Sequence, residues 1–496
     1  MSPSQPDIEP QTQIPGLTIY GIRGSSASES SSPSTTAGSD AMNARVMKQL
    51  KGGMYQADLT AEGAIFYADP DTVQTVLDRL RVHHNLTATS LTAGGQSSAA
   101  KPRLPKGGFK PRSNSYKPFV HLLNKIVDGA NECILGSHLS GLRFHTFAKE
   151  IDEKYGTVKG LKPNGIGVIG ELQTTVSWED VEISVESKST VEEMVKQAAM
   201  YAHCSLLNNL RRFFALGIGF NSTTLEAYVF VFHRSGLSAS PPLGLKKRLG
   251  FDALVKHLVG ILSIQGEAAY GLDVTHKQDI FHINNTYYQH VRFLYLHDSL
   301  VRGCATVVYS LDAYTNGVPP DMPSRMLSHS EGLKDNLPNK LTYKMTYPIK
   351  GQSQEGSLFS RVFRQFGIAN VLGFHSSGPE EPHGSTEPFF KSAVFWNIFE
   401  DKRYEEPGED SYPKDGHHEP EERGLRCIAF SGGGQSLLDL GNKDGGIPSP
   451  GELLETILHA IIGHCNLFIK GVLHCDVNDG NILRYMKPVQ CPELDM

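Results

Sequence analysis

The sequence predicts an α+β protein with more than one domain, and three observations support this. The chain has 496 residues, of which 39% are hydrophobic, enough to build two or three cores. Residues 119–231 switch repeatedly between helical and strand-like apolar spacing. Residues 453–468 repeat apolar side chains every three or four positions, which is typical of a long amphipathic helix.

The N-terminal part is predicted to be mostly unstructured. Residues 1–45 read as a disordered tail, because the stretch from Ser25 to Thr36 has almost no apolar residue to bury. Residues 46–118 combine a helical segment, with apolar residues at helical spacing from Val73 to Leu80 and Asp71 as N-cap, and a basic flexible linker.

Two folded domains are expected after this linker. Residues 119–240 form the first, of α/β type, and residues 250–496 form the second. An insert at 376–424 interrupts the second domain, and its Pro, Gly, Glu, Asp and His residues leave no periodicity. We expect this acidic insert to be a mobile loop.

Charge and cysteine content exclude several classes of function. The formal net charge of -6 gives no overall positive field, so we expect no nucleic-acid partner and no anionic membrane partner. The longest apolar runs are shorter than the roughly 20 residues needed to span a bilayer. Seven cysteines include no CxxC pair, so a metal site built on them is not predicted. The N-terminus also lacks the apolar core of a secretory signal peptide, so we expect an intracellular protein, in the cytoplasm or nucleus. The oligomeric state stays open.

A phosphotransfer motif lies near the C-terminus. His474, Asp476 and Asn481 fit the spacing H-x-D-x-x-x-x-N, followed by an apolar strand. In such a loop the Asp accepts the proton of the attacking hydroxyl, and the Asn holds a metal ion that bridges the phosphates. Both side chains must therefore reach one phosphoryl group.

The residues before this motif predict one long buried helix. Ser449, Pro450 and Glu452 supply an N-cap, a first-turn proline and a capping-box glutamate. Apolar residues then recur from Leu453 to Phe468, and Gly471 ends the run as a C-cap. The alternative is an ordinary core helix followed by a polar turn.

Several short segments, taken in order, resemble the fungal-type protein kinase family, in which a protein-kinase-like domain follows an N-terminal α/β region. The resemblance covers roughly residues 119–496. Its markers before the catalytic loop are Trp178-Glu179-Asp180-Val181, Val185-Glu186-Ser187-Lys188, His233-Arg234-Ser235-Gly236, Tyr270-Gly271-Leu272-Asp273, Arg302-Gly303-Cys304-Ala305-Thr306 and Gly463-His464.

The resemblance implies a protein Ser/Thr kinase that uses ATP and Mg²⁺ and acts on a protein substrate. Arg302, Gly303 and Thr306 would lie in the turn over the ATP phosphates, where small residues let backbone N–H groups approach. Lys344 would contact the phosphates, and Glu355 on the following helix would be its ion-pair partner.

The same resemblance assigns the C-terminal site residues. Asp476 would be the catalytic base, while Asn481 and Asp495 would bind Mg²⁺. Cys475 replaces the usual Arg of this loop, and the sequence stops at Met496, so the C-lobe is expected to be incomplete and the activity weak or absent. Two alternatives stay open: a catalytically dead kinase-like scaffold and a small-molecule phosphotransferase.

A second motif lies in the first domain. Asn164, Glu186 and Lys188 resemble the P-D…E-x-K arrangement of restriction-endonuclease-like folds. The chemistry of that site needs an Asp and a Glu to share Mg²⁺, and Asn164 stands where the Asp should be. We therefore expect these three residues to cluster on a small sheet in a domain without nuclease activity.

Overall fold

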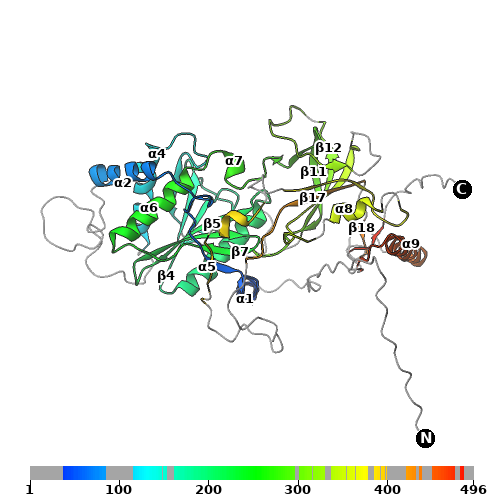
Figure 1. Ribbon diagram of the computed structural model, residues 1–496, viewed down its shortest axis with the longest axis horizontal. Coiled ribbons are helices and arrows are strands. Elements are labelled where there is room, and N and C mark those ends of the chain that lie inside the picture. The colour runs from blue at the N-terminus through cyan, green and yellow to red at the C-terminus, as the bar shows by residue number, and fades with distance from the viewer. Residues whose placement is uncertain are drawn as a thin grey trace, which may run out of the picture.

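Two large β-sheets organise the part of the chain that the structure describes (Figure 1). The computed structural model describes residues 37–84, 116–147, 149–152, 161–296, 301–315, 317–329, 337–352, 355–362, 365–377, 385–390, 392–396, 398, 420–431, 435–437, 449–474, 477 and 481–484. One sheet has nine strands and the other eight, and helices accompany both. The predicted α+β class is confirmed.

The nine-stranded sheet is mixed, with the order β16-β1-β7-β6-β5-β4-β3-β2 and β8 beside β6. β5 and β6 are buried at nearly every position because helices cover both faces of the sheet. The strands are β1 Met54–Gln56, β2 Leu142–Thr146, β3 Gly165–Ile169, β4 Ile183–Lys188, β5 Phe214–Asn221, β6 Glu226–His233, β7 Gly236–Ala239, β8 Leu243–Gly244 and β16 Val394–Phe395.

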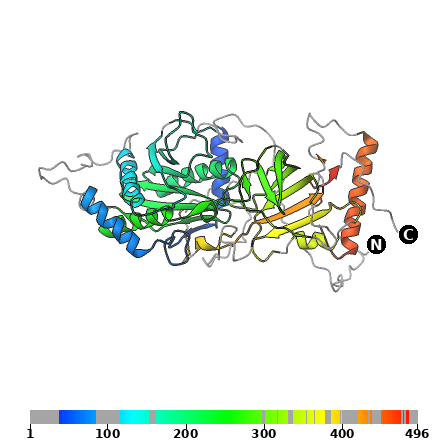
Figure 2. The ribbon, with the colours of Figure 1, turned by 90° about the horizontal axis from the view of Figure 1, so that it is seen from above.

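Two helical layers enclose this sheet. α1 (Ala37–Leu50) packs on α5 (Val191–Asn208) on one face, and α2 (Pro70–His84), α4 (Lys117–Asn131) and α6 (Arg248–Leu262) pack together on the other (Figures 1 and 2). The short helix α7, Gly266–Ala269, follows α6. We refer to this three-layer unit as the first domain.

The eight-stranded sheet is antiparallel throughout, with the order β13-β15-β17-β14-β12-β11-β10-β9. α8, Glu355–Ser360, follows β14 and packs on β15. The strands are β9 His276–Lys277, β10 Ile280–Ile283, β11 Thr286–Leu296, β12 Val307–Ala313, β13 Ser328–His329, β14 Lys340–Thr346, β15 Val371–Ser376 and β17 Arg426–Ser431.

The boundaries of the first domain differ from those predicted. α1 begins at Ala37, inside the predicted tail, and β1 joins the sheet parallel to β7. α6 was placed in the second domain by the predicted boundary at 240–250, but it packs against α2 and α4. The reason is that each segment buries its apolar side chains on the first sheet, which a sequence without contacts does not reveal. Residues 1–36 and 85–115, with most of the predicted tail and linker, lie outside the described residues.

The insert at 376–424 was predicted to be mobile, and for its aromatic part this is wrong. β16 pairs with β1, which adds a strand from the insert to the edge of the first sheet. Phe389, in the 3-10 helix η2 (Glu387–Phe390), is 3% exposed and stacks on His233 at a ring distance of 4.7 Å. Buried aromatic area offsets the ordering entropy of this segment. The acidic residues 399–419 lie outside the described part of the chain.

The predicted C-terminal helix is present, but its predicted burial is wrong. α9 spans Pro450–Ile469 with the capping box of Ser449 and Glu452, and Gly471 follows with a φ of 74°. Leu454 is 68% exposed, and the helix lies at the end of the molecule farthest from the first sheet (Figure 2). Within the described residues, α9 is the one helix whose length and apolar composition would allow a membrane span, which on its own is weak evidence of one.

Candidate functional site

Lys344 lies in the middle of the eight-stranded sheet. It belongs to β14 and pairs in register with Val308 of β12 and Ile428 of β17. Its neighbours on the strand, Tyr343 and Met345, are buried in the core. The lysine is therefore held on a strand that packing fixes from both sides, rather than on a mobile loop.

Lys344 forms a two-pronged ion pair with Glu355, the first residue of α8. Its Nζ donates to Oε1 at 2.7 Å and to Oε2 at 2.8 Å, and the two side chains are 22% and 25% exposed. Gly356 lets α8 approach β15, because a Cβ there would lie 2.3 Å from the Cγ of Phe374. The structure thus brings together the lysine and glutamate that the family resemblance implied as partners.

The turn at residues 301–306 precedes β12 and contains Arg302, Gly303 and Thr306. Thr306 lies close to β14, since its Oγ1 is 3.0 Å from that of Thr346. Arg302 and Gly303 contact the first domain instead: Gly303 N–H donates to the Arg234 carbonyl at 2.9 Å. We expected these backbone N–H groups to face a ligand, so the position of Gly303 differs from that expectation.

The predicted C-terminal site is only partly described. Asp476 and Asp495 lie outside the described residues, so their predicted roles stay predictions. Asn481 lies one residue before Ile482, whose carbonyl accepts the N–H of Leu437 at 3.0 Å. Next to this bond, β18 (Gln435–Ser436) pairs with β19 (Leu483–Arg484). This two-stranded pairing holds Asn481 near the chain that leaves the eight-stranded sheet after β17.

The second predicted cluster also assembles, around β4 of the first domain. Lys188 Nζ lies 2.9 Å from Glu186 Oε1, and the Tyr201 hydroxyl donates to Glu186 Oε2 at 3.0 Å. The Asn164 side-chain oxygen accepts the N–H of Ser187 at 2.8 Å. Glu186 is 2% exposed. The polar groups satisfy one another, and among the described residues no group of three or more His, Cys, Asp or Glu side chains could hold a metal.

Glu186 should make stability depend on pH. Burial raises its pKa above the usual value, although Lys188 opposes the shift. A carboxyl with a raised pKa destabilises the folded state increasingly as the pH rises past the unfolded pKa. We expect Glu186→Gln to gain stability relative to wild type in urea unfolding as the pH rises above the usual carboxyl pKa of 4.5. Glu171→Gln, at an exposed position, is the control. If the difference in unfolding free energy between Glu186→Gln and wild type does not change with pH, this account is wrong.

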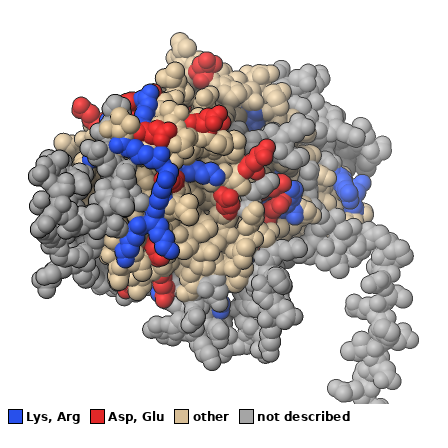
Figure 3. All heavy atoms as spheres, turned by 60° about the vertical axis from the view of Figure 1, so that its left-hand side comes forward, with Lys and Arg blue, Asp and Glu red and all other residues tan. Residues whose placement is uncertain are grey.

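Acidic and basic side chains are mixed on the side of the first domain that carries α2, α4 and α6 (Figure 3). Several cations there have carboxylate partners: Arg79 pairs with Glu132, and Arg81 lies 2.8 Å from Asp78. Such pairing offsets the positive charge of these two arginines.

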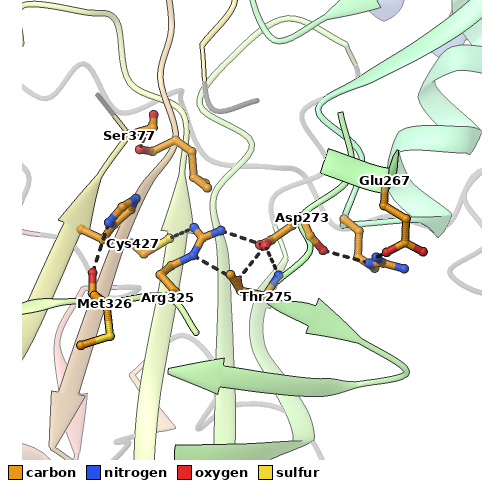
Figure 4. A network of polar contacts seen from close by, with 10 residues as sticks. Glu267, Asp273, Thr275, Arg325, Met326, Ser377 and Cys427 are labelled. Carbon is orange, nitrogen blue, oxygen red and sulfur yellow. Dashed lines mark hydrogen bonds and ion pairs between the residues drawn. The ribbon is translucent and has the colours of Figure 1, made fainter. Parts of the chain in front are cut away.

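Sequence reasoning missed a buried ionic network between the two sheets (Figure 4). Arg325 lies 2.8 Å from Asp273, donates to Thr275 Oγ1 at 3.1 Å and to Cys427 Sγ at 2.9 Å. Burial alone would raise the pKa of Asp273, but Arg325 and the hydrogen bonds from Thr275 hold it below the usual range. Asp273 belongs to a marker segment in the sequence, whereas nothing in the sequence pairs it with Arg325.

The His233–Gly236 turn was also singled out only as a marker, and it lies where the two sheets meet. His233 is fully buried, its Nδ1 accepts the Ser235 N–H at 3.2 Å, and its Nε2 lies 3.0 Å from Ser238 Oγ. Burial, and then the charge of Arg302, lowers the pKa of His233 to about 3, so the ring is neutral. The Ser235 hydroxyl also contacts Thr386 of the insert at 2.8 Å.

No protein-family model, no curated protein and no solved structure matches the chain.

Proposed function

We propose that this chain is an ATP-dependent phosphotransferase of the protein Ser/Thr kinase type, acting inside the cell on a protein substrate. The ion pair between Lys344 and Glu355 carries the proposal. In protein kinases a lysine on the third strand of the N-lobe contacts the ATP phosphates, and a glutamate on the next helix orients it.

The strand order supports the same assignment. β11, β12 and β14 are consecutive neighbours, the glutamate helix α8 follows β14, and β17 inserts between β14 and β15. Because α8 directly follows the lysine strand β14 in the antiparallel sheet, Glu355 reaches Lys344. We infer that β11 to β17 correspond to a kinase-type N-lobe, with the chain after β17 leading toward the catalytic loop.

The chemistry of Lys344 fits an anionic ligand. A lysine ammonium has three donors, and Glu355 takes two of them, which leaves one for a phosphate oxygen. ATP would supply the phosphoryl group, with Mg²⁺ held by Asn481 and Asp495. Asp476 would take the proton of the substrate hydroxyl, as its place in the motif predicts.

The test is nucleotide binding by calorimetry in the presence of Mg²⁺. Lys344→Met removes a charged hydrogen-bond donor, so we expect it to weaken ATP binding at least about tenfold. Lys340→Met is a matched control, because Lys340 lies on the same strand, is 78% exposed and pairs with Asp312 at 3.0 Å. ATP binding that both variants leave at the wild-type level would refute the assignment of Lys344.

A kinase-like scaffold without catalysis is the second candidate function. One observation favours it: the Gly303 N–H, which would face the phosphates in an active enzyme, is used by the Arg234 carbonyl. Transfer of radiolabelled phosphate to a generic protein separates the two candidates. An enzyme transfers phosphate and loses the transfer in Asp476→Asn, whereas a scaffold binds ATP or partners with no transfer in either form.

A further inference from the structure

The turn at residues 301–306 is anchored to the first domain at three successive residues. Val301 is fully buried in a hydrophobic cluster with Val46 of α1, and its N–H donates to Gln49 Oε1 at 3.3 Å. Arg302 and Gly303 continue the contact. The anchoring therefore combines burial of an apolar side chain with hydrogen bonds from the backbone.

Arg302 connects the turn with the insert and with the segment between α1 and β1. Its NH1 donates to the Lys51 carbonyl at 3.0 Å, and its NH2 lies 3.1 Å from Glu421 Oε1. The backbone of Gly53 passes so close that a Cβ there would lie 2.9 Å from Arg302 Cδ. The guanidinium is thus fixed by groups that belong to other parts of the chain.

Gly303 is held by the His233–Gly236 turn, which is buried and internally hydrogen-bonded. The Arg234 carbonyl accepts the Gly303 N–H at 2.9 Å, and the Arg234 guanidinium lies over the Tyr347 ring at 5.4 Å. The His233 ring fixes this turn through its contacts with Ser235 and Ser238. These contacts tie the Arg234 carbonyl, and with it the Gly303 N–H, to the first domain.

We propose that the first domain is an autoinhibitory clamp, which holds the 301–306 turn in a state of low nucleotide affinity and must release it for ATP to bind tightly. The clamp rests on the proposed function. A backbone N–H that donates to the Arg234 carbonyl cannot at the same time donate to a phosphate oxygen. The apparent affinity for ATP is then the affinity of the released state multiplied by the fraction of molecules in which the turn is released.

The test loosens the clamp without changing the residues assigned to the nucleotide. Gln49→Ala combined with Glu421→Ala removes one side-chain partner of Val301 and one of Arg302, in the full chain. Glu422→Ala is the matched control, because Glu422 is the next residue and pairs with Lys350 at 2.7 Å rather than with the turn. Two measurements follow: hydrogen exchange of peptides that cover residues 301–306, and the Kd of Mg-ATP.

We expect the double variant to exchange faster in the 301–306 turn and to bind ATP at least about fivefold more tightly. Glu422→Ala should match the wild type in both measurements. If hydrogen exchange in the 301–306 turn is unchanged in the double variant, the clamp is wrong, whatever the measured Kd of Mg-ATP. A second outcome is faster exchange with ATP binding that is unchanged or weaker in the double variant, while Lys344→Met still reduces ATP binding. This result would refute the inhibition but leave the proposed function standing. If none of the proteins binds ATP, the proposed function is wrong and the inhibition with it. Hydrogen exchange would still show whether the first domain holds the turn.

Discussion

Asp273→Ala is expected to lower the free energy of unfolding by about 3–5 kcal/mol, because it leaves the Arg325 guanidinium buried without its counter-charge. The side chains of Arg325 and Asp273 are 8% and 3% exposed, so water cannot replace the lost carboxylate. Thr275 would lose its hydrogen-bond acceptor as well. Urea unfolding at neutral pH measures the difference.

A double-mutant cycle gives this prediction its control. Asp273→Leu together with Arg325→Met removes both charges, and we expect the double variant to lose much less stability than the sum of the two single changes. Asp252→Ala breaks the surface pair with Arg248, whose side chain is 72% exposed, and should cost less than about 1 kcal/mol. If Asp273→Ala costs no more than Asp252→Ala, the network does not stabilise the fold.

The same network should weaken the protein in acid. The pKa of Asp273 is lowered in the folded state, so its contribution to stability is present above the unfolded pKa. That contribution is lost as the pH falls through the lowered folded pKa. The pH dependence is opposite for Glu186, because burial raises the pKa of that carboxyl and its ionisation costs stability as the pH rises.

Local sequence signals predicted the features that depend on neighbouring residues. The capping box at Ser449 and Glu452 marks the start of α9, whereas the pair of Lys344 and Glu355 was implied by the family resemblance and not by a local pattern. Both are present in the structure, but only the cap could be predicted without knowledge of the rest of the fold, because it joins residues three positions apart. The catalytic role of Lys344 is a separate question, which stays a proposal.

Burial and long-range contacts could not be predicted in the same way. The apolar period of α9 indicates a helix, but it does not say what covers the helix, and Ile461 is 55% exposed. The contact of Arg302 with Lys51 joins residues 251 positions apart. Since no sequence pattern links such positions, the contacts of the 301–306 turn with the first domain and the docking of the insert could be found only in the structure.

Gly236→Ala is expected to destabilise the first domain by about 3 kcal/mol or more, because strain and overlap add at this position. Gly236 has a φ of 133°, and a Cβ there would lie 1.9 Å from the Gly53 carbonyl oxygen. That oxygen accepts the Leu237 N–H at 2.8 Å, in the contact where β1 begins to pair with β7. The added methyl group must therefore push β1 away from the sheet.

Gly170→Ala separates the two causes. Gly170 has a φ of 79°, but a Cβ there would meet nothing within 4 Å, so this change adds only backbone strain of about 1–2 kcal/mol. Thermal and urea unfolding of both variants measure the difference. An equal loss in the two proteins would mean that the close approach of Gly236 to Gly53 contributes nothing. A larger loss in Gly236→Ala is the expected result, since only there does the side chain meet a backbone that cannot move without breaking the pairing of β1 with β7.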